Sequence, residues 1–199
     1  MRQPTTLSRR ESLASVLSVG LCAGLASVAD GAQAQQVGSC SRVLVVCFSR
    51  SGNTRLVAGH VRRTLNADLF EVQPAKPYPE DYEATVRQAE RERSTGFEPL
   101  LKETVADIGS YETIFLGFPI WGTTAPPVIR SFLSRYDLAG KTIFPLITHG
   151  GYGTGESLSV VSRLAPKAHL REGFTLQMDQ EREIQRRVAS WLGIVDVRI

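Results

Sequence analysis

The residues of this chain best suited to bind a ligand form a short loop, 49–54, that directly follows an apolar run. The hydroxyl groups of Ser49, Ser51 and Thr54 can donate hydrogen bonds, and Gly52 permits a left-handed turn of the backbone. A helix that begins at this point adds free N–H groups and the positive end of its dipole. The pattern indicates a site that holds a monoester phosphate without transferring it.

Three other chemistries that use a similar loop do not match its residues. A nucleoside-triphosphate P-loop requires a lysine, and residues 48–56 contain none. A dinucleotide site requires three glycines in a fixed spacing, whereas this loop has only Gly52. A cysteine phosphatase would place an arginine six residues after Cys47, but that residue is Asn53 and the next arginine is Arg55. The spacing therefore argues against a catalytic Cys47.

The rest of the chain alternates between apolar runs and amphipathic segments, which is typical of strands and helices that follow one another. We expect strands at 42–48, 68–73, 113–119, 142–147 and 174–177, and helices at 53–66, 79–94, 128–137, 156–166 and 180–192. This order predicts a three-layer α/β/α sandwich around a parallel sheet, with each crossover helix returning over one sheet face. Ligands of such sheets bind at the carboxyl ends of the strands, where loops 49–54, 119–125 and 148–155 would meet.

Three sequence stretches in this order, "VVCFSRSGNT", "GFPIWGTTAP" and "ITHGGYGTGES", resemble the cofactor loops of the flavodoxin-like family, which binds FMN. The resemblance covers residues 41–192. It implies a five-stranded parallel sheet in the order 2-1-3-4-5, with FMN at the switch point between strands one and three. Each loop follows its own predicted strand, and the three together are a far more specific signal than one serine-rich loop.

The resemblance also implies which residues contact FMN. The first loop would hold the phosphate, and the other two would line the isoalloxazine ring. The residues are Ser49, Arg50, Ser51, Gly52, Asn53 and Thr54 in the first loop; Pro119, Ile120, Trp121, Gly122 and Thr123 in the second; and Thr148, His149, Gly150, Gly151 and Gly153 in the third. The Arg50 side chain could add positive charge to the phosphate site or point into solvent. No catalytic acid or base and no metal-ligand spacing is predicted.

Three residues of these loops carry more specific hypotheses. Trp121 could stack on the flavin ring or, alternatively, belong to the core. Gly122 could let its peptide flip when the flavin is reduced, because glycine accepts both signs of φ. A positively charged His149 near the ring could raise the reduction potential, although a histidine that faces solvent is equally consistent with the sequence.

Three functions fit a flavodoxin-like chain. The first is electron transfer between FMN and a redox partner protein. The second is an NAD(P)H-dependent FMN reductase of quinones or other small electron acceptors, and the third is a flavin-binding protein without turnover. Tyr78 and Tyr82 bear on this choice, because they could shape a substrate pocket; we expect them to pack the second helix instead.

Residues 1–34 have the pattern of an export signal. Arg9 and Arg10 precede an apolar stretch over 13–29, and Ala32-Gln33-Ala34 provides small residues for cleavage. The paired arginines resemble those of a twin-arginine signal. The alternatives are a signal for the general secretory route and an uncleaved membrane anchor. We expect a periplasmic flavodoxin-like domain of residues 35–199 that does not associate with the membrane.

The charges of the chain are interspersed and its net charge is +3, which does not favour nucleic acid as a partner. Many flavodoxins are acidic and meet basic redox partners. This chain is slightly basic instead, so the resemblance does not extend to those partners.

Overall fold

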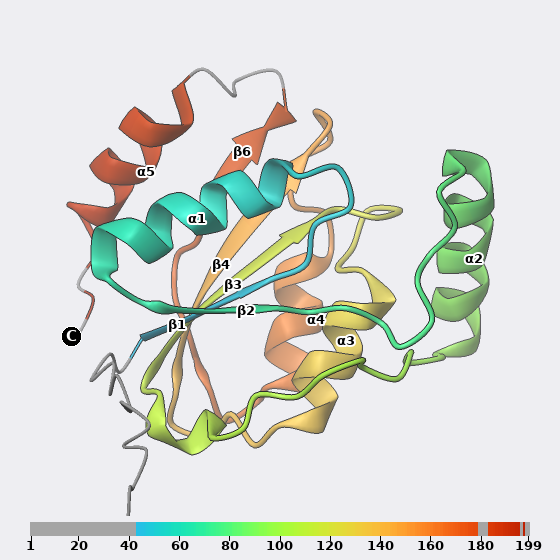
Figure 1. Cartoon of the computed structure of the whole chain (residues 1–199), viewed down its shortest axis with the longest axis horizontal. Helices are drawn as coiled ribbons and strands as arrows, with labels where there is room; N and C mark the ends of the chain where they lie inside the picture. Colours follow the sequence, from blue (N-terminus) through green and yellow to red (C-terminus); the bar gives the residue numbers. More distant parts are fainter. Residues whose placement is uncertain (1–42, 179–182, 196, 198–199) are drawn as a thin grey trace, which may run out of the picture. The chain divides into compact units, whose positions relative to one another are not determined.

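The computed structural model describes residues 43–178, 183–195 and 197 (Figure 1). The predicted export signal at 1–34 lies outside these residues. All described residues belong to one unit of the chain, Gly38–Ile199. Among them, no helix has the length and apolar character that a bilayer span requires.

A parallel β-sheet forms the centre of this unit (Figure 1). Its strands are β1 (Val43–Cys47), β2 (Asp68–Glu71), β3 (Thr113–Pro119), β4 (Thr142–His149), β5 (His169–Leu170) and β6 (Phe174–Gln177). The order is β2-β1-β3-β4, and both β5 and β6 pair with β4 in the fifth position. This arrangement confirms the predicted order 2-1-3-4-5. Strands β1 and β3 are buried along nearly their whole length, as continuous apolar runs in a covered parallel sheet should be.

The fifth position is divided into two short strands, of which only β6 was predicted. The carbonyl of Ile143 accepts a hydrogen bond from the Arg171 N–H, so the backbone of Ile143 faces the fifth position. Every second residue of β4 faces the same way. Pro145 is the next residue of β4 to face it, and proline has no N–H to donate. A Cβ on Gly173 would lie 2.3 Å from the Pro145 carbonyl oxygen, so the chain passes very close there. The missing donor and the close approach account for the break between β5 and β6.

Helices cover both faces of the sheet, as the alternating pattern predicted (Figure 1). Helices α1 (Asn53–Leu65) and α5 (Ile184–Leu192) cover one face, and α3 (Pro127–Arg135) and α4 (Ser157–Leu164) cover the other. Each of the four presents an apolar stripe to the sheet. The described core is therefore divided into two layers by the sheet, and this rigid frame fixes the three loops at its carboxyl edge.

Helix α2 (Tyr82–Thr95) is an exception to the expected arrangement. It lies beyond the carboxyl ends of the strands and packs against α3 (Figure 1). Its only buried residues are Thr85, Ala89 and Glu92, too small and polar a set to cover a sheet face. The segment that follows, with the short 3₁₀ helix η1 (Ile108–Ser110), contributes apolar side chains to the core instead. Helix α2 is thereby left to line the edge where ligands bind.

Candidate functional site

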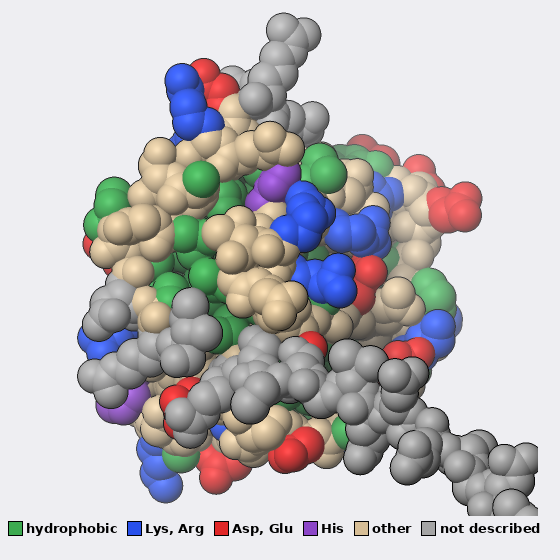
Figure 2. Space-filling model, turned by 60° about the vertical axis from the view of Figure 1, so that its left-hand side comes forward, with side chains coloured by type: hydrophobic (Ala, Val, Ile, Leu, Met, Phe, Trp, Pro, Cys, Tyr) green, Lys and Arg blue, Asp and Glu red, His purple; other side chains and the backbone are tan. Residues whose placement is uncertain are grey.

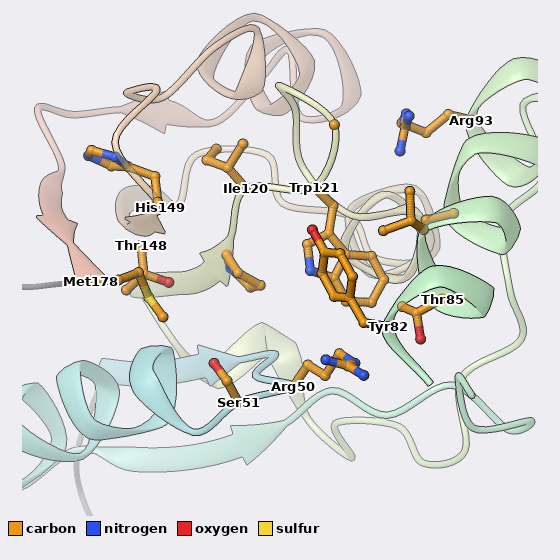
Figure 3. Close-up of a pocket in the computed structure, with 15 residues that line it drawn as sticks. Arg50, Ser51, Tyr82, Thr85, Arg93, Ile120, Trp121, Thr148, His149 and Met178 are labelled. Atoms are coloured by element: carbon orange, nitrogen blue, oxygen red, sulfur yellow. The ribbon is translucent and has the colours of Figure 1, made fainter. Parts of the chain in front are cut away.

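The three predicted loops and α2 surround one cavity of about 370 Å³ (Figure 3). Nine of the predicted residues line it: Arg50, Ser51, Pro119, Ile120, Trp121, Gly122, Thr148, His149 and Gly150. The other seven lie in the same loops but not in the lining: Ser49, Gly52, Asn53, Thr54, Thr123, Gly151 and Gly153. The volume is at the lower end of the range of small-molecule and cofactor sites. The sequence thus identified loops that the fold does bring together.

The first loop leads into the N-terminus of α1 in a conformation that leaves backbone donors free. Gly52 adopts φ +99°, a left-handed conformation, and a Cβ placed on it would meet no atom within 4 Å. The N–H groups of residues 53–55 precede the first helical hydrogen bond, which joins Leu56 to Gly52, and no side chain caps them. The first turn of α1 also lacks acidic residues. This end of the helix therefore fits a phosphate group by its donors, its open space and its dipole.

The side chains of this loop divide into ligand donors and structural contacts. Ser51 is exposed and lines the cavity, while the Ser49 hydroxyl accepts a hydrogen bond from the Gly52 N–H at 3.1 Å. The Thr54 hydroxyl is buried and lies 2.7 Å from the hydroxyl of Thr148. The Asn53 amide group contacts the sulfur of Met178. Thr54 and Asn53 therefore tie the first loop to its neighbours, and their backbone N–H groups, rather than their side chains, are the donors available to a phosphate.

Arg50 lies across the side of the cavity instead of at the helix N-terminus. Its guanidinium donates a hydrogen bond to the carbonyl of Glu80, and its central carbon lies 5.9 Å from the centre of the Tyr82 ring. Both contacts connect the first loop to the start of α2. The exposed side chain fits the solvent-facing alternative, and its contacts hold it beside the entrance of the cavity.

The second loop is a tight turn whose backbone is fixed by Trp121 and Thr124. The Trp121 N–H donates to the Thr124 carbonyl at 3.0 Å, and both residues between them, Gly122 at φ +54° and Thr123 at φ +66°, have positive φ. This is the pattern of a type I′ turn. A β-branched residue at positive φ is strained, and such strain concentrates at functional sites. The Thr123 carbonyl accepts a hydrogen bond from the Glu156 N–H at 2.8 Å, so the third loop holds this turn in place.

Trp121 forms a wall of the cavity and is only partly buried. Its ring meets Phe48 and Tyr78 edge to face, with centroid separations of 5.2 and 4.9 Å. The Tyr78 hydroxyl in turn donates to the carboxylate of Glu92 at 2.8 Å. Trp121 is thus held from behind by two rings at the edge of the core and presents its remaining surface to the cavity.

The third loop is organised by the His149 ring. The Nδ1 atom of His149 accepts hydrogen bonds from the N–H groups of Gly151 and Gly153, at 3.0 and 3.3 Å. Two backbone N–H groups thus converge on one ring nitrogen, which acts as their acceptor in this arrangement. The side chain lines the cavity, and its observed role is to shape the loop.

Helix α2 supplies a wall that the sequence did not reveal. Five of its residues line the cavity: Tyr82, Thr85, Val86, Ala89 and Arg93. Their spacing places them on one helical face. Tyr82 is 67% exposed, so the expectation that it packs the helix is wrong, whereas Tyr78 is partly buried in the aromatic contacts described above. Met178, directly after β6, was also missed. The low apolar content of α2 and the position of Met178 at a strand end were the available signals.

Cys47 has no role in the cavity. It is 1% exposed at the end of β1, and burial, reinforced by the nearby charge of Glu71, raises the pKa of its thiol to about 12. A thiol that stays protonated is a poor nucleophile, in agreement with the argument from its spacing. Within the described ranges, no group of His, Cys, Asp or Glu side chains is arranged to hold a metal ion.

The chain matches a known protein family over most of its length. The family model described as Flavodoxin matches residues 42–194. The structure is similar to that of a putative flavoprotein of Bacteroides eggerthii, with a TM-score of 0.70 and 30% identity over 79% of this chain and 99% of that one. A putative flavoprotein of Bacteroides uniformis gives a TM-score of 0.67 and 27% identity, over 77% of this chain and 98% of that one.

A more distant structure shares the fold. A flavoprotein of Lactobacillus acidophilus in complex with FMN gives a TM-score of 0.61 and 19% identity, over 73% of this chain and 97% of that one. A search of curated proteins finds no match. These results confirm the family and fold predicted from the sequence, and they support FMN as the cofactor. With its sheet order and its three loops at one edge, the chain belongs to the flavodoxin family.

Proposed function

We propose that this protein binds FMN in the cavity between the three loops and transfers electrons between that cofactor and a redox partner. The observation that carries the proposal is the uncapped N-terminus of α1 at one side of a cavity whose other walls include Trp121 and His149. The N-terminus of α1 supplies donors for a phosphate, and the walls with Trp121 and His149 supply aromatic and polar surfaces for a flat ring. The bound FMN supplies the redox chemistry, which the protein tunes.

Residues of the chain would hold and shield the cofactor. The N–H groups at residues 53–55 and the hydroxyls of Ser49 and Ser51 fit the phosphate. Pro119, Ile120 and Trp121 fit the ring, because they present apolar and aromatic surface that excludes water from it. The N–H groups of the third loop that donate to His149 are engaged, so this histidine fixes the loop shape against which the ring would lie.

An absorption spectrum of the freshly purified protein tests the binding, and rapid mixing with reduced pyridine nucleotide tests the mode of action. A yellow protein whose flavin is not bleached by NADH or NADPH, but exchanges electrons with a reduced protein partner, is the expected result for a carrier. A colourless protein that does not take up added FMN would overturn the proposal.

A reductase of small acceptors is the second candidate, and one observation favours it. The cavity extends beyond the predicted loops to a face of α2, where the exposed side chains of Tyr82 and Val86 offer apolar surface to a small molecule. In this case NAD(P)H would supply a hydride, and a quinone would leave as the hydroquinone after taking up two electrons and two protons. Rapid bleaching of the flavin by NADH or NADPH, followed by reoxidation on addition of a quinone, is the result expected for this candidate.

The charge of the surface bears on the partner. Figure 2 shows one face on which Lys and Arg side chains gather beside a histidine, with Asp and Glu side chains scattered around them. Together with the net charge of +3, this gives no reason to expect a strongly basic partner protein. A partner with an acidic docking face, or a small acceptor, fits these charges better.

We further propose that the protein acts outside the cytoplasm. The proposal rests on the sequence of residues 1–34 alone, with its paired arginines and its small residues before a cleavage point. Export of the folded chain through a twin-arginine route would allow FMN to be bound before transport. Fractionation of cells that express the full chain should find the shortened, FMN-bound protein in the periplasm, and replacement of Arg9 and Arg10 by Lys should retain it inside.

A further inference from the structure

The part of the cavity next to α2 has a distinct composition, and we call it the α2 slot. It is lined by Tyr82, Val86, Ala89 and Arg93 of α2 and by Gly122 of the second loop. Tyr82 and Val86 are 67% and 43% exposed, which is a large exposure for apolar and aromatic side chains that lie on the inner face of a helix. Small-molecule sites are typically lined by apolar side chains, with a few polar or charged groups that fix the orientation of the ligand.

The positive charge in this slot is held close to the second loop. A Cβ on Gly122 would lie only 2.4 to 2.7 Å from atoms of the Arg93 guanidinium, so the guanidinium packs directly on that glycine. Within the described part of the chain, this guanidinium makes no hydrogen bond or ion pair with another residue. The cavity lining contains Arg50 and Arg93 but no Asp or Glu. Arg93 is therefore available to an anionic ligand.

Neighbouring charges reinforce the positive potential at this corner. The Arg130 guanidinium lies behind the same turn, where it donates to the Ala125 carbonyl and the Thr124 hydroxyl at 3.3 Å. Burial lowers the pKa of Arg130, and the nearby charges of Arg163 and Arg93 lower it further, while Glu98 and Glu156 act in the opposite direction. The charges of Arg163 and Arg93 therefore repel that of Arg130, and those of Glu98 and Glu156 offset part of this repulsion.

The slot is separate from the expected phosphate site. Figure 3 shows Ser51 of the first loop and Arg93 of α2 on opposite sides of the cavity, with Trp121 of the second loop in between. A phosphate at the N-terminus of α1 would leave the charge of Arg93 unmatched. A second molecule with its own negative charge would match it.

We propose that the α2 slot binds a small planar electron acceptor that carries an anionic group, with its ring between Trp121 and the inner face of α2 and its charge on Arg93. A sulfonated or carboxylated quinone is the chemical class that this composition selects. The inference rests on the second candidate function given above, because it names the acceptor of that reaction. Guanidinium groups bind such oxyanions through paired hydrogen bonds, which gives both affinity and orientation.

Calorimetric titration of the oxidised, FMN-loaded protein with a naphthoquinone sulfonate and with the unsulfonated naphthoquinone tests the proposal, without NAD(P)H and hence without turnover. Arg93→Gln should weaken binding of the sulfonate by about tenfold or more, as the loss of a hydrogen bond to a charged group predicts. It should leave binding of the unsulfonated quinone nearly unchanged. Arg93→Lys should restore part of the affinity for the sulfonate, since it keeps the charge but not the paired donors.

The matched control is Arg91→Gln, which removes an exposed arginine of the same helix that does not line the cavity. It should change neither affinity, and melting curves of all variants establish that they are folded. Equal affinity of the sulfonate for the original protein and for Arg93→Gln would overturn the proposal, as would no binding of the sulfonate at all. A chain that takes up no FMN would instead contradict the proposed function, and the same titration on that flavin-free chain would still decide the role of Arg93.

Discussion

The hydroxyl groups of Thr54 and Thr148 lie 2.7 Å apart, although the two residues are separated by 94 positions in the sequence. Both are buried, with 1% of each residue exposed. The contact joins the first turn of α1 to the end of β4, and thus the expected phosphate loop to the loop that His149 organises. This hydrogen bond adds to the pairing of the strands in fixing the positions of these two parts of the cavity.

Replacing either threonine by valine should destabilise the fold, because the remaining hydroxyl would be buried without its partner. The expected loss is about 1 to 3 kcal/mol in the free energy of unfolding for each single change. The double variant Thr54→Val, Thr148→Val should lose less than the sum of the two, since no unpaired hydroxyl remains. Urea unfolding of the four proteins measures this coupling, and strictly additive losses would show that the bond contributes nothing.

The ring of His149 should be replaceable by a side chain that offers an acceptor in the same place. His149→Asn can keep an oxygen near the position of Nδ1 and should retain the loop that Gly151 and Gly153 form. His149→Ala removes the acceptor and should loosen this exposed loop. Limited proteolysis, with cleavage mapped by mass spectrometry, should detect faster cutting within 150–155 in the alanine variant only. Equal cutting of all three proteins would contradict the structural role of this histidine.

The hydrogen bond from Tyr78 to Glu92 should contribute measurably to stability. Glu92 is 7% exposed, and its other carboxylate oxygen accepts from Gln88, so Tyr78→Phe leaves one buried oxygen without this donor. The expected loss is about 1 to 3 kcal/mol in the free energy of unfolding. Tyr82→Phe is the matched control, because that residue is largely exposed, and it should change stability by no more than about 0.5 kcal/mol.

Burial of Cys47 should make the fold less stable in alkaline solution. Its thiol has a pKa raised from 9.0 to about 12 in the folded chain, so the unfolded chain loses this proton first as the pH rises. Stability from this group is complete below pH 9 and is lost progressively as the pH rises through about 12. The slope within this window should approach about 1.4 kcal/mol per pH unit.

Cys47→Val separates this effect from the tyrosines that titrate in the same range. Burial also raises the pKa of Tyr111, to about 12, so both proteins should lose stability in alkali. The variant should lose less than the original protein between pH 9 and 12, since valine fills the site without a proton to release. Parallel curves of unfolding free energy against pH would contradict the raised pKa of this buried thiol.

The sheet and the three loops were predictable because each depends on local sequence. Runs such as "VLVVC" and "TIFLGFP" are apolar throughout, which indicates strands covered on both faces, and the parallel order places their carboxyl ends together. The position of Trp121 directly before a glycine at a strand end indicated a residue of the cavity wall, and Trp121 does line the cavity, partly buried and packed against the core. These inferences need no knowledge of distant contacts.

The remaining features depend on tertiary contacts that no local pattern records. The helical pattern of α2 was recognised, but its position follows from how little apolar surface it offers to the sheet. Arg93 therefore entered the cavity without a signal in any motif, whereas Tyr82 had been considered as a pocket residue and was expected to pack the helix instead. The partner of the Thr54 hydroxyl lies on another strand, and the break between β5 and β6 follows from the way that Pro145 faces that edge.

The most direct test of the account is a fluorescence titration of the flavin-free protein with FMN, with riboflavin as the ligand that lacks the phosphate. The open N-terminus of α1 predicts that FMN binds at or below micromolar concentration. It also predicts that riboflavin binds at least about tenfold more weakly, because the charge-assisted hydrogen bonds to the phosphate are missing. Equal binding of the two flavins would contradict the phosphate site, and no binding of FMN at micromolar concentration would contradict the central claim.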